Sequence, residues 1–365
     1  MPRPFLRALL VLSALGVAPA RAEEKVLNVY NWSDYIGAET VAAFEHATGI
    51  TVHYDVYDSN EVLEAKLLAG HSGYDLVVPS AEPFLARQVK AGVYRPLDRA
   101  RIPNWGNLDP AMMAAVAGAD PGNAHGAIWA WSTTGLGENV AKVRAALGPD
   151  APLDSLAVLF DPKNAAKLKD CGVTMLDSAA EVFPVALRYL GLDPASQDLG
   201  DLKRAQALLM SVRPYVRYFH SSQYINDLAN GGVCLSLGFS GDVLIAQQRA
   251  HDAGNGVGIE YRLPREGTIE SFDMMAIPAD APHPEAAEAF INFVLQPTVM
   301  AGISNTVFYA NGVPATKPLL RPALADNPNV FPAPALAAKL FPGSEVSARY
   351  ERERTRAWTT VTTGH

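Results

Sequence analysis

Short apolar runs alternate with amphipathic helical stretches in the first ninety residues, and this alternation most constrains the fold. Strands are expected over 26–32, 50–57 and 74–78, and helices over 39–46, 61–69 and 81–90. Gly49 and Gly70 end the first two helices, and Ser80 is expected to cap the third. Strands joined by helices through short connections build a mainly parallel, doubly wound sheet. The sequence therefore predicts an α/β fold.

The middle of the chain repeats this alternation as a second unit. Helices are expected over 140–147, 155–159, 180–190 and 242–253, and strands over 173–176 and 233–237. Residues 128–135 and 254–258 are candidates for the crossings between the two units. Glycine and other small residues in these stretches can absorb the dihedral changes of a hinge.

Residues 1–22 have the three parts of a secretory signal peptide. Arg3 and Arg7 supply the positive start, residues 8–18 supply the apolar stretch, and an Ala-Arg-Ala sequence ends at Ala22. The apolar stretch is too short to span a bilayer, and no cysteine lies near the cleavage point to carry a lipid. We expect cleavage after Ala22 and a freely soluble periplasmic protein; the alternative is an uncleaved N-terminal membrane anchor.

Charge limits the classes of binding partner, and the number of cysteines bears on whether a disulfide forms. The formal charge of −8 becomes −11 after cleavage, because the signal segment has three arginines and no acid. Nucleic acid and anionic membranes are therefore poor partners, whereas a cationic ligand is compatible with this charge. The two cysteines, Cys171 and Cys234, are an even number in an exported chain. This favours a disulfide over two free buried thiols.

Sequence signatures of enzymes are missing. None of the eight histidines has metal-ligand spacing such as HExxH, and there is no GxSxG, Walker or GxGxxG sequence. Adjacent residues on one element rarely face each other, so His220-Ser221-Ser222 is better explained by a structural or capping role than by nucleophilic catalysis. We expect neither an enzyme nor a bound cofactor or metal.

Acids stand next to aromatic residues where three strands are expected to end or begin. These runs are Trp32-Ser33-Asp34-Tyr35, Gly238-Phe239-Ser240-Gly241-Asp242 and Ser271-Phe272-Asp273. A helix-capping acid or a packed aromatic residue explains any single pair, but three pairs together favour a site at the carboxyl ends of the strands. Carboxylates accept hydrogen bonds from ammonium groups, and aromatic faces attract cations. The pattern predicts a site for an organic cation.

Segments over nearly the whole mature chain resemble the periplasmic polyamine-binding proteins of ABC importers, especially the putrescine and spermidine receptors. They are NVYNWSDYIGAETVAAFE, YDVYDSNEVLEAKLLAG, YDLVVPSA, RYFHSSQYINDLANG and VFYAN. The resemblance implies a type II-like periplasmic binding protein fold, with two α/β lobes that close over ligand at a hinge. The first lobe is expected to comprise residues 23–131 and 256–301, and the second 132–255 and 302–365. A polyamine and the membrane permease of an ABC importer are the implied partners of a monomer.

The resemblance also assigns roles to individual residues. It implies a first binding loop that includes Ser33, aromatic walls at Trp32, Tyr35 and Tyr309, and a polar contact at Ser80. It also implies carboxylate partners for the amines at Asp34, Glu181, Asp242 and Asp273. The family's paired cysteines coincide with Cys171 and Cys234, which strengthens the expectation of a disulfide.

Three positions depart from the family pattern. Phe239 stands where the family usually has Trp, and Ser271 where it usually has Phe or Trp, so one aromatic wall is thinner. Glu82 adds either an acid at the rim or a first-turn acid favoured by the helix dipole. We expect binding of putrescine or a close relative. The alternatives are a receptor for another cationic amine, a sensor that hands its ligand state to a signalling partner, and, least favoured, an exported hydrolase using Asp242 or Asp273.

Overall fold

The computed structural model describes residues 25–365, and the expected signal peptide lies outside these residues. The strands are β1 (Val26–Trp32), β2 (Thr51–Tyr57), β3 (Leu76–Val77), β4 (Gly126–Asn139), β5 (Val173–Met175), β6 (Val216–Phe219), β7 (Leu235–Phe239), β8 (Ile259–Arg262), β9 (Ile269–Ala276) and β10 (Phe341–Pro342). The helices are α1 (Ala38–Thr48), α2 (Asn60–Leu68), α3 (Ala86–Lys90), α4 (Pro110–Ala115), α5 (Val140–Leu147), α6 (Ala157–Phe160), α7 (Pro162–Leu168), α8 (Ala179–Tyr189), α9 (Leu199–Val212), α10 (Gln223–Ala229), α11 (Ser240–Ala253), α12 (Pro284–Val294), α13 (Pro297–Val307), α14 (Pro322–Ala325), α15 (Pro334–Ala337) and α16 (Ala348–Thr363).

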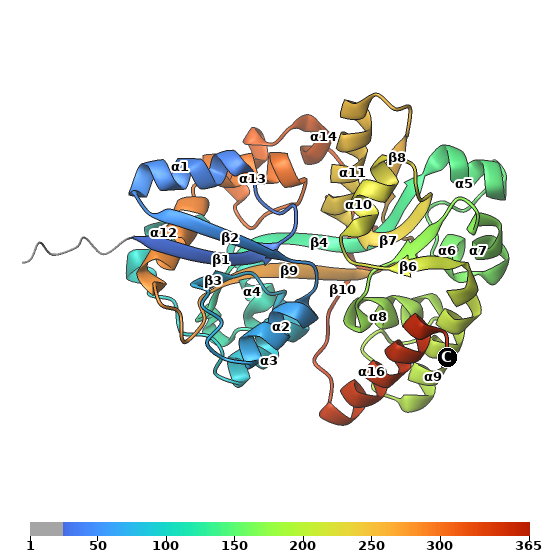
Figure 1. Ribbon diagram of the computed structural model, residues 1–365, viewed down its shortest axis with the longest axis horizontal. Helices are drawn as coiled ribbons and strands as arrows, with labels where there is room; N and C mark the ends of the chain where they lie inside the picture. The colour runs from blue at the N-terminus through green and yellow to red at the C-terminus, as the bar shows by residue number, and fades with distance from the viewer. Residues whose placement is uncertain (1–24) are drawn as a thin grey trace, which may run out of the picture.

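Strand β4 runs through the centre of the molecule and is buried along its whole length (Figure 1). Its first part pairs antiparallel with β9, and its second part pairs antiparallel with β7 and β8. The strand therefore joins two sheets, and the expected crossing at residues 128–135 lies inside it. The two expected α/β units are confirmed.

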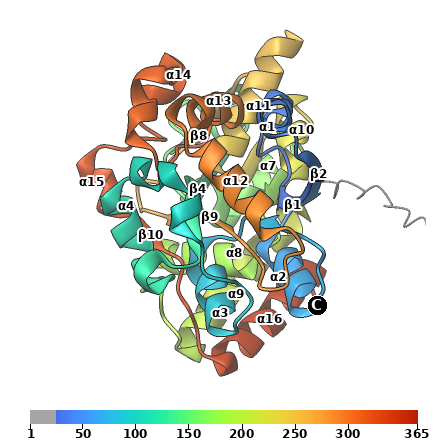
Figure 2. The same ribbon diagram turned by 90° about the vertical axis from the view of Figure 1, so that its left-hand side faces the viewer.

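Parallel strand pairs lie in each half, on either side of β4. β1 is parallel to β2 and β3, and β5 is parallel to β6 and β7. Helices cover both faces of each sheet (Figures 1 and 2). In the first half α1, α12 and α13 lie on one side and α2, α3 and α4 on the other; in the second half α10 and α11 lie opposite α8, α9 and α16. Burial on both faces explains why β4 shows no alternation of polar and apolar residues.

The chain does not cross between the two halves at residues 254–258, where the second crossing is expected. These residues connect α11 to β8, and both elements contact β4 in the second half. The chain crosses instead at residues 263–268, between β8 and β9. It crosses again at residues 343–347, not at the expected boundary after residue 301. This segment joins β10, which pairs with β9, to α16, which contacts α8 and α9. The glycines at 254–258 therefore form a connection within one half.

The third expected helix, over 81–90, is not continuous. Residues Ala81–Leu85 form a π-type turn in which Glu82 is extended, and α3 begins only at Ala86. The expectation that Ser80 caps this helix is wrong, because its side chain makes no capping hydrogen bond. The Ser80 hydroxyl donates to Asp273 of β9 at 2.6 Å instead. An acceptor distant in sequence therefore determines the orientation of this side chain.

The two cysteines form the expected disulfide, which is thereby confirmed. Cys171 and Cys234 lie 5.5 Å apart between their Cα atoms, within the range that a bridge requires. Cys171 follows α7, and Cys234 directly precedes β7, the strand that carries the second acid-aromatic run to the middle of the molecule. The bridge ties that strand to the helical layer of the second half.

Candidate ligand-binding site

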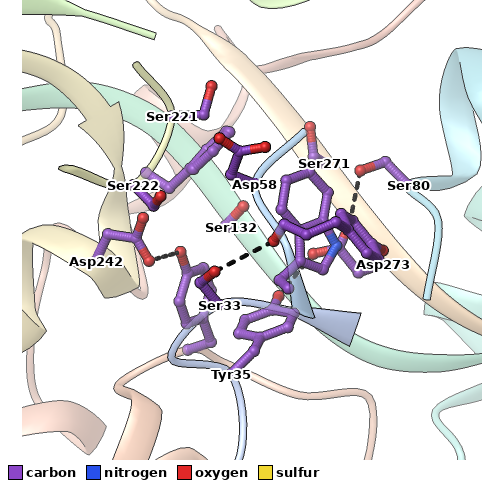
Figure 3. A pocket seen from close by; sticks show the side chains of 14 residues that line it. Ser33, Tyr35, Asp58, Ser80, Ser132, Ser221, Ser222, Asp242, Ser271 and Asp273 are labelled. Carbon is purple, nitrogen blue, oxygen red and sulfur yellow. Dashed lines mark hydrogen bonds between the residues drawn. The ribbon is translucent and has the colours of Figure 1, made fainter. Parts of the chain in front are cut away.

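A cavity lies between the two halves, where several strands end; about 440 Å³ of space there, open solvent included, is not filled by protein atoms. Its lining comes from both halves and from β4 between them (Figure 3). The lining residues are Trp32, Ser33, Tyr35, Tyr57, Asp58, Ser80, Ser132, Ser221, Ser222, Phe239, Asp242, Ser271, Asp273 and Tyr309. All three acid-aromatic runs of the sequence thus reach one cavity.

Asp273 lines the cavity from the first half. Its side chain lies on β9, and the residue is 7% exposed. Ser80 Oγ donates to Oδ1 at 2.6 Å, and the Tyr35 hydroxyl donates to Oδ2 at 2.6 Å. Burial raises the pKa of Asp273 to about 6, although both hydrogen bonds favour the ionised form. Each oxygen therefore has one neutral donor.

Asp242 lines the cavity from the second half, in the first turn of α11, and is 6% exposed. The Tyr309 hydroxyl donates to Oδ1 at 2.7 Å, and the Tyr224 hydroxyl donates to Oδ2 at 2.7 Å. Burial raises the pKa of Asp242 to about 7 against these two hydrogen bonds. Figure 3 shows Asp242 and Asp273 on opposite sides of the cavity.

Aromatic rings form much of the wall between the two acids. The Trp32 indole nitrogen donates to the Val78 carbonyl at 2.9 Å, which fixes the ring against the cavity. Its ring centroid lies 4.9 Å from Tyr57 and 6.1 Å from Phe239 of the other half. Tyr35 and Tyr309 meet edge to face at 4.7 Å. These rings offer apolar and π surface to a ligand that reaches between the acids.

Asp34 does not line this cavity. Its side chain is 40% exposed and pairs with Arg249 of α11, with Oδ1 2.7 Å from Nη2. Arg249 Nη1 also donates to Asn226 at 2.8 Å. The expected ammonium partner is therefore already paired with a guanidinium from the opposite half.

Glu181 and Glu82 also lie outside the lining of this cavity. Glu181 on α8 accepts a hydrogen bond from Thr134 at 2.7 Å, and burial raises its pKa to about 7. Glu82 lines a neighbouring hollow together with Glu270, and its Oε2 is buried without a hydrogen-bond partner in the part of the chain that the structure describes. Ser271 lines both the cavity and this hollow. Ser271 therefore lies between the cavity and the hollow, and a larger aromatic side chain at this position would block more of the space between them.

Several lining residues were missed in the sequence. Tyr57 and Asp58 stand at the end of β2, so the strand-end rule that found the other runs could have found them. Asp58 Oδ2 lies 3.6 Å from Nε2 of His220. His220 Nδ1 accepts the backbone N–H groups of Ser222 and Gln223 at 3.1 Å, the capping role favoured for this residue. Nothing local marks Tyr224 as a site residue.

The electrostatics of the cavity suit a cation. Asp242 and Asp273 form no ion pair with Lys, Arg or His in the part of the chain that the structure describes, and their hydrogen-bond donors are all hydroxyl groups. No group of three or more His, Cys, Asp or Glu within residues 25–365 could hold a metal ion. A ligand that brings its own positive charge would supply the missing counter-ions.

Comparisons with known proteins agree with this geometry. Residues 39–333 match the family model described as bacterial extracellular solute-binding protein. The putrescine-binding periplasmic protein SpuD of Pseudomonas aeruginosa is 49% identical over 368 residues, covering 100% of both chains. The putrescine-binding periplasmic protein PotF of Escherichia coli is 50% identical over 354 residues, covering 97% of this chain and 95% of that protein.

The fold is similar to that of a solved binding protein. The spermidine/putrescine ABC transporter substrate-binding protein PotD of Streptococcus pneumoniae superposes with a TM-score of 0.73 and 25% identity. The match covers 93% of this chain and 99% of that one. The expected two-lobed α/β fold is thus confirmed. The chain belongs to the family of bacterial extracellular solute-binding proteins.

Proposed function

We propose that this protein binds putrescine, or a close aliphatic diamine, in the cavity and delivers it to an ABC importer. The observation that carries the proposal is the pair of buried carboxylates, Asp242 and Asp273, which come from different halves and have no cationic partner among residues 25–365. The two relatives at 49% and 50% identity, whose names give putrescine as their ligand, support it. No bond is made or broken in this function.

The ligand's two ammonium groups would replace the missing counter-ions. A carboxylate has about four lone-pair positions, so Asp242 and Asp273 can each accept from an ammonium group while keeping their two hydroxyl donors. Trp32, Phe239 and Tyr35 would cover the methylene chain. Because the acids belong to opposite halves, a dication has more favourable contacts in the closed form and shifts the equilibrium toward it.

Export and lobe motion complete the proposal. The signal peptide would be cleaved after Ala22 and release a monomer into the periplasm, where it meets the membrane permease of the importer. The halves are proposed as lobes that move about the crossings, with the later boundaries drawn at 263–268 and 343–347 rather than after residues 255 and 301. A sensor that reports ligand to a signalling partner would use the same site.

Titration calorimetry tests the ligand class. Putrescine, cadaverine, agmatine and spermidine are compared with butylamine and 1,4-butanediol, which keep the carbon chain but lose one or both charges. We expect 1:1 binding of a diamine and no measurable binding of the diol. Asp242→Asn and Asp273→Asn should each weaken binding by about 30-fold or more, since truncating a buried charge pair costs ~2 kcal/mol or more.

A matched control separates the site from general effects of charge. Asp227 accepts the Tyr218 hydroxyl at 2.6 Å, a similar Tyr-Asp pair outside the cavity lining. Asp227→Asn should therefore leave the affinity unchanged. The absence of heat with all four amines would refute the proposal.

A second candidate ligand class is a longer cationic amine such as spermidine. It is favoured by Ser271, which lines both the cavity and the neighbouring hollow. It is also favoured by Glu82 in that hollow, whose Oε2 has no hydrogen-bond partner within the described residues. In this case Glu82→Gln should weaken spermidine binding at least about fivefold and leave putrescine binding unchanged. Equal effects on both ligands would exclude a role for the hollow.

A further inference from the structure

The segment Gly238–Asp242 places two tyrosine rings against bare backbone. A Cβ atom at Gly238 would lie 2.5 Å from the ring of Tyr224, and one at Gly241 would lie 2.1 Å from the ring of Tyr309. Such approaches are possible only because neither glycine has a side chain. The same two tyrosines are the ones that donate to Asp242, one to each oxygen.

We propose that Gly238, Gly241, Tyr224 and Tyr309 form one unit, the acid clamp, which positions Asp242 for the ligand's ammonium group. Each glycine makes room for one ring, and each ring's hydroxyl holds one carboxylate oxygen. Tyr224 is the positioning residue that this adds to the site. The inference rests on the proposed function, because it concerns how the cation is bound.

The direction of the Tyr224 hydrogen bonds is fixed by its surroundings. Its hydroxyl oxygen accepts the backbone N–H of Phe239 at 2.9 Å, and an N–H group can only donate. The hydroxyl proton is then directed to Asp242 Oδ2. Tyr224 is fully buried, and its hydroxyl has no other acceptor among its hydrogen bonds in the described chain. A proton on Oδ2 would therefore leave the Tyr224 hydroxyl without an acceptor.

The clamp consequently favours the ionised form of Asp242. Two O–H donors face its oxygens, which opposes the effect of burial on this carboxyl. Asp34 and Arg249 act on Asp242 with opposite signs, and they pair with each other at 2.7 Å. Asp58 and Asp273 are acids that line the same cavity as Asp242. Through Phe239, the Tyr224 hydroxyl also connects the acid to the aromatic wall beside Trp32.

Tyr224→Phe removes one hydroxyl and keeps the ring in place. We expect putrescine binding at pH 7 to weaken about tenfold, the loss of one hydrogen bond to a charged group. The acid limb of the affinity profile between pH 5.5 and 9 should also move to higher pH. Tyr309→Phe should move it in the same direction, and this second variant carries the test if Tyr224→Phe does not fold.

The control is Tyr218→Phe, which removes the Tyr-Asp hydrogen bond to Asp227 and should change neither the affinity nor the profile. In an Asp242→Asn background, Tyr224→Phe should have less than about a twofold effect, because the group through which it acts is gone. Calorimetry on the full mature chain measures all variants, and circular dichroism checks their folding.

The outcomes are distinguishable. If the wild-type protein binds none of the amines, the proposed function fails and this inference fails with it. If the wild-type protein binds and Tyr224→Phe behaves like Tyr218→Phe, only the inference fails. An equal loss in the wild-type and Asp242→Asn backgrounds would assign Tyr224 a packing role and overturn the clamp.

Discussion

Lowering the pH from 8 to 5 should weaken diamine binding steeply. In the free protein, burial raises the pKa of Asp242 to about 7 and that of Asp273 to about 6. Aliphatic amines keep their protons over this range, with pKa values near 10 as for lysine. An ammonium ligand favours the ionised carboxylates, so both acids must lose their protons on binding. The effect therefore has one sign: affinity falls as the acids become protonated.

The magnitude follows from the two pKa values. At pH 8 both acids are mostly ionised, and at pH 5 about one Asp242 in a hundred and one Asp273 in ten remain so, given pKa values of about 7 and about 6. The dissociation constant should therefore rise about a hundredfold through Asp242 alone and up to about a thousandfold through both. Glu181 lies outside the cavity lining and is not included.

Calorimetry at pH 6 in two buffers of different protonation enthalpy counts the protons released on binding. We expect between about one and one and a half protons for the wild-type protein. Asp242→Asn should bind more weakly but release only about half a proton, since Asp273 alone then titrates. A dissociation constant that stays level from pH 5 to 8, with no proton release, would show that the acids are already ionised in the free protein and refute the argument from burial.

Three further changes test other parts of the structure. Burial raises the pKa of Glu138, which is fully buried, to about 8, so the folded protein keeps a proton that the unfolded chain loses above pH 4.5. In urea unfolding, the free energy of unfolding of Glu138→Gln minus that of wild type should increase by about 2.5 kcal/mol from pH 5 to 7. A difference that stays constant with pH would contradict this. Replacing Cys171 and Cys234 by Ala should lower the free energy of unfolding by about 4 kcal/mol. Wild type under reductant is the control and should show the same loss. Arg249→Met, which removes the partly exposed pair with Asp34, should speed ligand release in stopped-flow at most about fivefold; a larger change would mean that this pair dominates closure.

Much of the local structure could be predicted from the sequence. β1 and α5 have the expected bounds, because hydrophobic periodicity and terminating residues are local signals. The disulfide was also predictable from residue type and family resemblance. Strands that cross between sheets are harder to recognise, since β4 is buried on both faces and gives no alternation.

Long-range contacts set the limits of prediction at the site. Ser80 has the sequence context of a helix cap, but its acceptor, Asp273, lies 193 residues away. Gly238 and Gly241 have the sequence context of turn residues, yet in the structure they make room for rings from α10 and from the segment after α13. No local rule connects a glycine to an aromatic ring so far along the chain.

Asp34 and Asp273 show what distinguishes two acids with the same local pattern. In the sequence both stand beside an aromatic residue where a strand is expected to end or begin, and the family resemblance predicts that both bind an ammonium group. Asp273 is 7% exposed, and its donors within residues 25–365 are both hydroxyl groups, whereas the Asp34 side chain is 40% exposed and pairs with Arg249. A carboxylate with neutral donors still lacks a counter-ion, and one paired with arginine does not. The identity of the donors, which only the tertiary structure supplies, therefore decides which of these acids is available to a cationic ligand.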